Sequence, residues 1–197
     1  QIIMDEFINF FGKKKDYRSL SNFYEGYIEI KGYRLYESGE HGYHGEKYFR
    51  LGNLCEDEVR KQKMIAHSKG FLKPSIYKTC NEAKKMGGKK GFGLNEEEQQ
   101  KWFSIGLDVQ KEICLWKYKH FEEVRNDLLK SQKKILIHPA MRVNEEKVKN
   151  KFWEGRCVVR NDKLVVLGKN MLGNIWMEIR DCGNSDIAPG TSIISGL

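Results

Sequence analysis

Glu40, His44 and Lys47 bring a carboxylate, an imidazole and an amine together at intervals of four and three residues. On a helix, side chains at these intervals share one face. Side chains of these three types serve general acid–base and nucleophilic catalysis. The alternative is a solvated helix face, on which a Glu–His pair contributes only about 0.2–0.5 kcal/mol.

The same stretch, "ESGEHGYHGEKYF", is interrupted by glycines that include Gly42 and Gly45. Glycine inside a helix costs about 1 kcal/mol relative to alanine, so stability alone does not explain them. Both glycines fall on other sides of the predicted helix, where they allow another element or a ligand to approach the backbone closely. We therefore expect a tightly packed helix that presents Glu40 and Lys47 to a ligand.

A metal site is a second interpretation of this stretch, with His41, His44 and Glu40 as ligands. Zinc takes three or four ligands, and no cluster of cysteine or histidine follows nearby in the sequence. We therefore predict no metal and no other cofactor.

The segment "LSNFY" places Ser21 and Asn22 before two aromatic residues. The amide of Asn22 has the donors and acceptors to bind a base edge, and Phe23 or Tyr24 has a face on which a base stacks. A turn closed by Asn22, with Phe23 in the core, is equally consistent with the pattern and compatible with binding.

The composition limits the class of protein. The chain has 197 residues, 40% hydrophobic and 31% charged, with a net charge of +8. This length favours a single domain spanning 1–197, with a core at about 16–182 and a flexible tail at 183–197. The positive charge favours an anionic partner such as a nucleotide or nucleic acid, and lysine-rich solvated helices are the alternative.

The sequence predicts a cytoplasmic or other intracellular protein that does not enter a membrane. It has five cysteines without a Cys-x-x-Cys pair, no secretory segment and no apolar run of about 20 residues.

The first half of the chain predicts a short helix at 5–12 and a hairpin at 27–36 that turns at Lys31-Gly32. Ser38 is expected to cap a helix that runs to about Leu51, and 56–70 is expected to form a second helix. Pro74 is expected to open a short helical piece, and the glycine- and lysine-rich segment 87–93 is a predicted loop.

The second half predicts a capping box between Asn95 and Glu98, with helix to Phe103 and again over 107–129. A buried strand at 134–139, a hairpin at 157–168 and a helix at 170–180 follow. Asn170 is expected to cap this last helix, and Arg180 to form an ion pair or cap its end. Helices with a few hairpin strands, and no βαβ alternation, indicate an α+β fold that is mainly helical.

"LSNFY", a predicted hairpin and then "SGEHGYHGEKYF" resemble the NADAR (YbiA-like) family. The pattern of that family runs Ser-Asn-Phe, a strand pair, Glu-His, and a lysine seven residues after the glutamate. Later segments agree in order: "NEAKKMGG", Trp102 at the opening of a long helix, "KYKHF" and "GKNMLGNIWMEIR". The resemblance covers residues 18–180.

The resemblance implies hydrolysis of an N-glycosidic bond. Relatives act on riboflavin-pathway intermediates, and others remove ADP-ribose from modified nucleobases. The substrate would be nucleotide-like or contain ADP-ribose, and ADP-ribosylated nucleic acid is one such substrate. Breaking a ribose–nitrogen bond builds positive charge at C1′ and O4′, which a carboxylate stabilises.

The resemblance makes Glu40 the catalytic carboxylate. Lys47 would donate to a leaving base or phosphate, or attack C1′ as a Schiff-base nucleophile. Arg18 and the lysines near 87–90 are candidates for holding phosphates. The residues expected to bind substrate are Arg18, Ser21, Asn22, Phe23, His41, His44, Trp102, Asn150 and Trp153. Core packing is the alternative for both tryptophans.

The chain departs from the family pattern at two acidic positions. His138 stands where the family usually has a glutamate, and Asn150 where it has an aspartate. If that aspartate is catalytic, this chain is impaired or uses another carboxylate, such as Glu145, Glu146 or Glu154. The departures favour an alternative function, a degenerate module that binds ADP-ribose or nucleic acid without turnover. A third possibility is a nucleic-acid-binding protein that relies on net charge alone.

Overall fold

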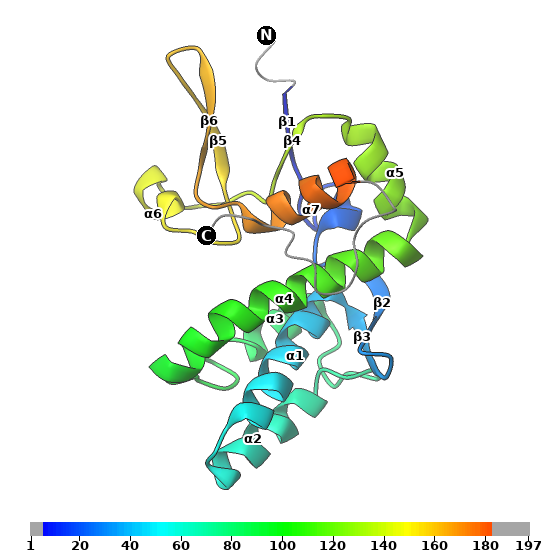
Figure 1. Cartoon of the computed structure of the whole chain (residues 1–197), viewed down its shortest axis with the longest axis vertical. Coiled ribbons are helices and arrows are strands. Elements are labelled where there is room, and N and C mark those ends of the chain that lie inside the picture. The colour runs from blue at the N-terminus through cyan, green and yellow to red at the C-terminus, as the bar shows by residue number, and fades with distance from the viewer. Residues whose placement is uncertain (1–5, 183–197) are drawn as a thin grey trace. The chain divides into compact units, whose positions relative to one another are not determined.

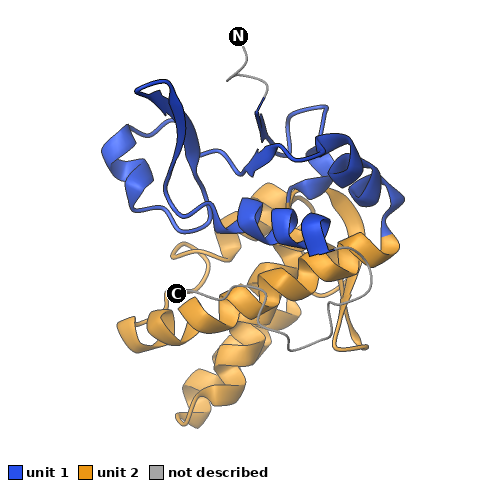
Figure 2. Cartoon of the chain, turned by 45° about the horizontal axis from the view of Figure 1, so that its top comes forward, with its two compact units in different colours: residues 1–21, 121–197 blue, residues 22–120 orange. Residues whose placement is uncertain are grey.

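The computed structural model describes residues 6–182 and divides the chain into two compact units (Figure 2). Unit 1 comprises residues 1–21 and 121–197, and unit 2 comprises residues 22–120. The tail predicted at 183–197 lies outside the described residues.

Unit 2 is built around helix α1, which contacts three other helices and the neighbouring hairpin (Figure 1). Its elements are β2 (Glu25–Ile30), β3 (Arg34–Ser38), α1 (Gly39–Leu54), α2 (Glu58–Lys69), α3 (Cys80–Met86) and α4 (Glu96–His120). Strands β2 and β3 pair antiparallel, and Lys31 and Gly32 at their turn have positive φ angles of 55° and 76°. The predicted hairpin is therefore confirmed, and its loop has three residues because Ile30 pairs with Arg34.

Helix α1 begins where the sequence predicts. The hydroxyl of Ser38 accepts a hydrogen bond of 3.2 Å from the backbone N–H of His41, which satisfies one of the first free donors of the helix. Gly42 and Gly45 lie against the hairpin: a Cβ at Gly45 would come within 2.5 Å of the Tyr36 ring. The glycines thus allow α1 to pack closely, as expected.

Two capping boxes set the starts of α3 and α4. Thr79 and Glu82 bond reciprocally, so α3 begins at Cys80. The prediction that Pro74 opens a helix is therefore wrong, because the chain forms turns until this later cap. Asn95 and Glu98 form the predicted second box, at 2.8 Å in both directions.

Helix α4 runs without interruption to His120, and the next helix starts only after Phe121, which has the extended backbone of a cap residue. The predicted helix at 107–129 is therefore two helices. Hydrophobic periodicity continues across the break, which is why the sequence pattern does not show it.

Unit 1 contains short strands and three α-helices in its described part. Its elements are β1 (Phe7–Asn9), the 3-10 helix η2 (Arg18–Leu20), α5 (Glu122–Ser131), β4 (Ile135–Ile137), α6 (Glu145–Lys149), β5 (Arg156–Arg160), β6 (Lys163–Leu167) and α7 (Met171–Cys182). The helix predicted at 5–12 is wrong, because this segment pairs as a parallel strand with β4, Ile8 opposite Leu136. The hairpin at 157–168 is confirmed, with positive φ at Asn161 and Asp162.

The final helix is tied to strand β4. The side chain of Asn170 donates to Leu136 O at 2.8 Å and accepts from the N–H of His138 at 2.9 Å. Asn170 thus joins α7 to the strand through its side chain, in addition to standing where the helix begins. Arg180 forms the predicted ion pair, with Asp181, and also donates to Lys134 O.

The described residues form seven α-helices and three two-stranded sheets, a mixed α+β fold as the sequence predicts. Among these residues, no helix has both the length and the apolar character that crossing a bilayer requires.

Candidate functional site

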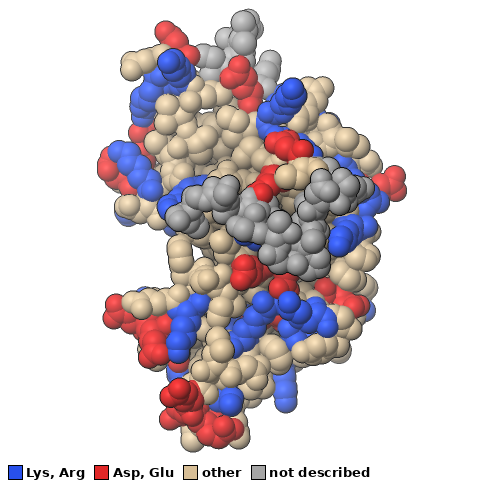
Figure 3. Space-filling view, in the orientation of Figure 1, with Lys and Arg blue, Asp and Glu red and all other residues tan. Residues whose placement is uncertain are grey.

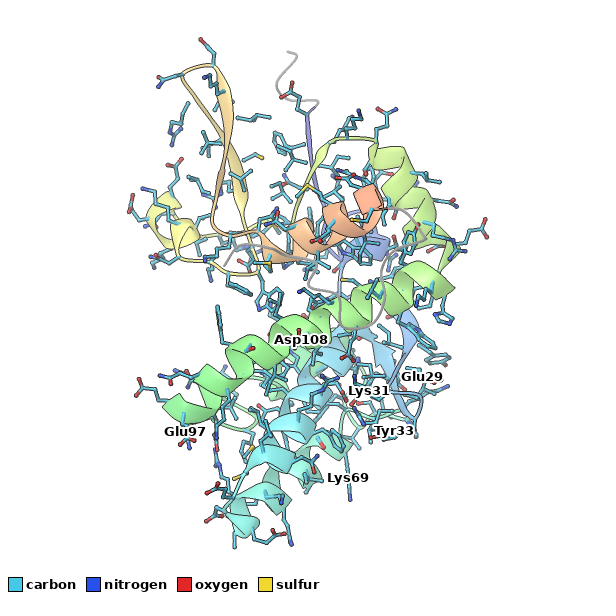
Figure 4. The ribbon with its side chains drawn as sticks, in the orientation of Figure 1. Glu29, Lys31, Tyr33, Lys69, Glu97 and Asp108 are labelled. Atoms are coloured by element: carbon cyan, nitrogen blue, oxygen red, sulfur yellow. The ribbon has the colours of Figure 1, made fainter. Side chains whose placement is uncertain are left out.

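Glu40, His44 and Lys47 lie on one face of α1, and this face is buried. Each of the three residues is 8% exposed. The Oε1 atom of Glu40 lies 2.9 Å from Nε2 of His44. The alternative of a solvated helix face is therefore wrong. The charged residues that do face water lie elsewhere in unit 2, such as Lys31 beside Tyr33 at the hairpin turn (Figure 4).

Lys47 is held between α1 and the end of α3. Its Nζ donates a hydrogen bond of 2.6 Å to the carbonyl oxygen of Gly87 and lies 5.9 Å from the centre of the Tyr43 ring and 5.8 Å from that of Trp102. Burial lowers the pKa of Lys47 to about 8, although the charge of Glu40 acts to raise it. A buried amine with so low a pKa is a common feature of nucleophilic lysines.

His44 is fixed from two sides. Its ring packs against Gly87, where a Cβ would come within 2.1 Å of Nδ1, so only glycine fits there. Burial lowers the pKa of His44, against the opposing effect of Glu40. The imidazole is therefore neutral at pH 7, and since the carboxylate of Glu40 only accepts, Nε2 carries the proton. Nδ1 is then a bare acceptor, buried and without a hydrogen-bond partner in the described residues.

Asn22 lies at the start of α1. Its backbone oxygen accepts from the N–H of Glu40 at 2.9 Å, and its side-chain amide bonds reciprocally with Gln110 of α4, at 2.7 and 3.0 Å. Gly39 lies directly beneath this amide, since a Cβ there would approach Oδ1 of Asn22 within 2.8 Å. The structure thus brings Asn22 next to Glu40 in space, as the family pattern implies.

His41 has both ring nitrogens occupied. Nε2 lies 2.8 Å from the carbonyl oxygen of Tyr77, and Nδ1 lies 2.7 Å from the hydroxyl of Ser38. The thiol of Cys80 lies 3.3 Å from the same hydroxyl. His41, Ser38 and Cys80 line a hollow of about 500 Å³ together with Glu25, Gly26, Tyr27, Glu37 and Lys78. This hollow is next to the start of α1, but Glu40 and Lys47 do not line it.

A second hollow, of about 580 Å³, lies at the other end of α1. It includes Leu54 and the ion pair of Arg60 with Glu98, at 2.8 Å. None of the predicted site residues lines it. Within the described chain there is also no group of three His, Cys, Asp or Glu side chains suited to a metal ion.

Phe23 and Trp102 are the aromatic residues of unit 2 that were predicted to bind substrate. Phe23 is half-buried, with the ammonium of Lys84 at 5.8 Å from its ring centre. Trp102 is 9% exposed and meets Tyr43 edge to face at 5.1 Å. Trp102 therefore belongs to the core and at the same time lies near Lys47.

The remaining predicted residues belong to unit 1. Arg18 is exposed and starts η2, and Ser21 is buried just after it. Asn150 is an exposed cap at the end of α6, and the half-buried Trp153 packs edge to face on Phe152. Their role in substrate binding stays a prediction.

The carboxylates considered as replacements are also in unit 1. Glu145 pairs with Arg160 at 2.6 Å, and Glu146 with Lys149 at 2.8 Å. The half-buried Glu154 accepts from the N–H of Asn170 through its backbone. His138 stacks on Phe10 at 5.7 Å.

Comparison with known protein families gives one match. The profile of the NADAR domain matches residues 9–182, most of the 197-residue chain. The chain belongs to the NADAR family. Members of this family are generally hydrolases. No curated protein matches the sequence at a significant level.

The NADAR match extends over both compact units, and it confirms the resemblance carried by "LSNFY" and "SGEHGYHGEKYF". Sequence reasoning missed Gly87 and Gln110, which bond to Lys47 and Asn22, and it missed the buried Lys117 further along α4. Gln110 and Lys117 are 2% and 1% exposed and follow at an interval of seven along the buried stripe of α4. Polar residues at apolar positions of a helical repeat are a signal that was present in the sequence.

Proposed function

We propose that this NADAR protein hydrolyses the N-glycosidic bond between ribose and base, in an ADP-ribosylated nucleobase or a ribose-phosphate-linked metabolite, with Lys47 and Glu40 as catalytic residues. The observation that carries the proposal is the burial of Lys47 beside the Glu40–His44 pair. Burying charged groups is costly, so the burial of Glu40 and Lys47 on one helix face supports a role other than stability.

The low pKa of Lys47 favours a nucleophile over a permanent cation. With a pKa of about 8, about one molecule in ten carries a neutral amine at pH 7. An ordinary lysine, with a pKa near 10.4, is neutral in only about one molecule in three thousand. Burial thus raises the concentration of the reactive form by more than about a hundredfold.

In the proposed reaction, the lone pair of the Lys47 amine attacks C1′ of the ribose. The bond from C1′ to the base breaks, its electrons leave with the base nitrogen, and that nitrogen takes up a proton. The C1′–O4′ bond then opens, O4′ is protonated, and the amine loses its protons to form an imine with C1′. Water adds to C1′ and the amine departs, so one water molecule is consumed and Lys47 is regenerated.

Glu40 and His44 have separate tasks in this scheme. The carboxylate of Glu40 stabilises the positive charge that develops at C1′ and O4′, and it accepts the proton of the attacking water. His44 donates its Nε2–H to Glu40 at 2.9 Å and so fixes the carboxylate in place. Because His44 is neutral, it orients Glu40 without cancelling its negative charge.

Phosphate groups of the substrate would be held by lysines that surround Gly87. Lys84, Lys85, Lys89 and Lys90 are exposed and form no ion pair within the described residues. They flank the residue whose carbonyl binds Lys47. The face that Figure 3 shows carries basic and acidic side chains intermixed.

The test is release of base from ADP-ribosylated guanosine and from ribosylated pyrimidine phosphates. The proteins compared are the wild type, Glu40→Gln, Lys47→Arg, and Lys69→Arg as an exposed control on α2. Glu40→Gln and Lys47→Arg are expected to lose at least about a hundredfold in rate, while the control keeps its activity. With cyanoborohydride, the wild type should acquire a ribosyl adduct at Lys47, identified by mass spectrometry.

A second candidate function is binding of ADP-ribose without turnover. It is favoured by His138 and Asn150 at positions where the family usually has acidic residues. A wild type that releases no base from any substrate, yet melts at a higher temperature with ADP-ribose, would establish this function and overturn the hydrolase.

A further inference from the structure

Gln110 is a buried amide on α4 that the proposed reaction does not use. It is 2% exposed and lies among the buried residues of α4, which include Val109 and Ile113. A buried primary amide has a high cost unless its groups are hydrogen-bonded. Its Oε1 accepts from Asn22 Nδ2 at 2.7 Å, and its Nε2 donates to Asn22 Oδ1 at 3.0 Å.

This reciprocal pair determines which way the amide of Asn22 faces. A reversed Asn22 amide would place donor against donor and acceptor against acceptor unless Gln110 reversed as well. Gln110 is held in its orientation because its Nε2 also donates to Sγ of Cys114, at 3.5 Å. An asparagine amide has two N–H groups, and the pair uses one. The second N–H of the half-buried Asn22 has no partner in the described residues.

The remaining N–H belongs to a residue that adjoins the start of α1. The backbone oxygen of Asn22 accepts from the backbone N–H of Glu40 at 2.9 Å, and the side-chain amide of Asn22 rests on Gly39. A donor held at the start of the helix that carries Glu40 is suited to an acceptor on the substrate, either a ribose hydroxyl oxygen or a carbonyl oxygen of the base.

We propose that Gln110 is a positioning residue that fixes the amide of Asn22 so that its second N–H donates to the sugar or base of the substrate. The inference rests on the proposed function, because it assumes that substrate binds beside Glu40. Gln110 itself does not touch the substrate.

The test uses Gln110→Glu, in which the carboxyl group replaces the amide with little change of shape. A protonated carboxyl group donates to Asn22 Oδ1 and accepts from Nδ2, as glutamine does. An ionised one only accepts, and it faces Asn22 Oδ1 with another acceptor. Burial raises the pKa of such a glutamate into the range of the assay. The control is Gln100→Glu, an exposed position on the same helix.

We expect kcat/KM of Gln110→Glu, divided by that of the wild type at each pH, to fall at least about tenfold between pH 5 and pH 8. The loss should appear mainly as a higher KM, because Asn22 binds substrate already before the reaction. Gln100→Glu should give a ratio near one throughout. A ratio for Gln110→Glu that does not change with pH, in a folded protein, would overturn the proposal.

A measurement on the wild type covers the case in which the variant does not fold. In its NMR spectrum, one proton of the Asn22 side-chain amide should be protected from exchange by Gln110, and only the other should shift when ADP-ribose is added. Both protons exchanging freely, or neither shifting with ADP-ribose bound, would contradict the inference. An inactive wild type that still shows the single shift would contradict the proposed hydrolase alone.

Discussion

Nζ of Lys47 donates to the carbonyl oxygen of Gly87 over 2.6 Å, although the two residues are forty positions apart in the sequence. The Cα of the same glycine lies against the ring of His44. One residue at the end of α3 therefore fixes both a proposed nucleophile and the partner of the proposed carboxylate. The geometry of the site depends on this contact as much as on α1.

The first prediction concerns pH. Because the neutral amine is the reactive form, base release by the wild type should rise with pH until about 8 and then level off. The charge of Glu40 raises the pKa of Lys47, so removing it in Glu40→Gln should move the amine's titration to lower pH. The titration is measured by NMR of labelled lysine, and a midpoint near 10.5 in the wild type would contradict the burial of Lys47.

The second prediction concerns Gly87→Ala. The added Cβ would come within 2.1 Å of the His44 ring and 2.7 Å of its Cβ, and we expect a loss of about 1–3 kcal/mol in stability and a marked fall in activity. Gly93→Ala is the matched control, since a Cβ there meets nothing within 4 Å. Thermal unfolding of both variants checks this, and equal melting temperatures would show that His44 does not pack on Gly87.

The third prediction compares two glycines of α1. A Cβ at Gly45 would meet the Tyr36 ring at 2.5 Å, whereas one at Gly42 would make ordinary contacts of 3.5 Å or more. Gly45→Ala should cost about 1–3 kcal/mol, while Gly42→Ala should be neutral or stabilise by up to about 1 kcal/mol through helix propensity. Urea unfolding gives both values. A larger loss of stability for Gly42→Ala than for Gly45→Ala would mean that α1 presents a different face to the hairpin.

The fourth prediction concerns the exposed lysines after Gly87. Replacing Lys89 and Lys90 by alanine should raise KM for substrates that carry phosphates and leave kcat unchanged. The dependence of KM on salt should also weaken, because fewer cations meet the phosphates. Lys69→Ala on α2 is the control. A double variant with unaltered KM would place the phosphates elsewhere.

Local signals were sufficient for much of the fold. The caps at Ser38 and Asn95 and the turn at Lys31-Gly32 depend on residues within four positions of one another, so the sequence predicts them. The strand at Phe7–Asn9 depends on β4, far along the chain. Considered alone, the phenylalanines and isoleucine of the segment 5–12 resemble an amphipathic helix. Pairing with β4 therefore makes this segment a strand, although its local sequence pattern indicates a helix.

The same distinction holds for the site. The spacing of Glu40, His44 and Lys47 predicts a shared face, and the structure has one. The spacing does not predict which residues of other helices contact that face. Gly87 reaches Lys47 from α3, and Gln110 reaches Asn22 from α4, and such contacts follow from helix packing rather than from any periodic pattern.

The glycines of α1 have a further consequence for how the protein can change. Gly39 faces Asn22, Gly45 faces Tyr36 and Gly52 faces Ile65, so the helix fits its neighbours in only one rotational phase. A single residue inserted into or deleted from α1 would turn the rest of the helix by about 100° and separate these contacts from the proposed catalytic groups. We therefore expect insertions and deletions to be tolerated only outside α1. We therefore expect substrate preference to change with the exposed Lys89 and Lys90, while Gly87 and α1 are kept residue for residue.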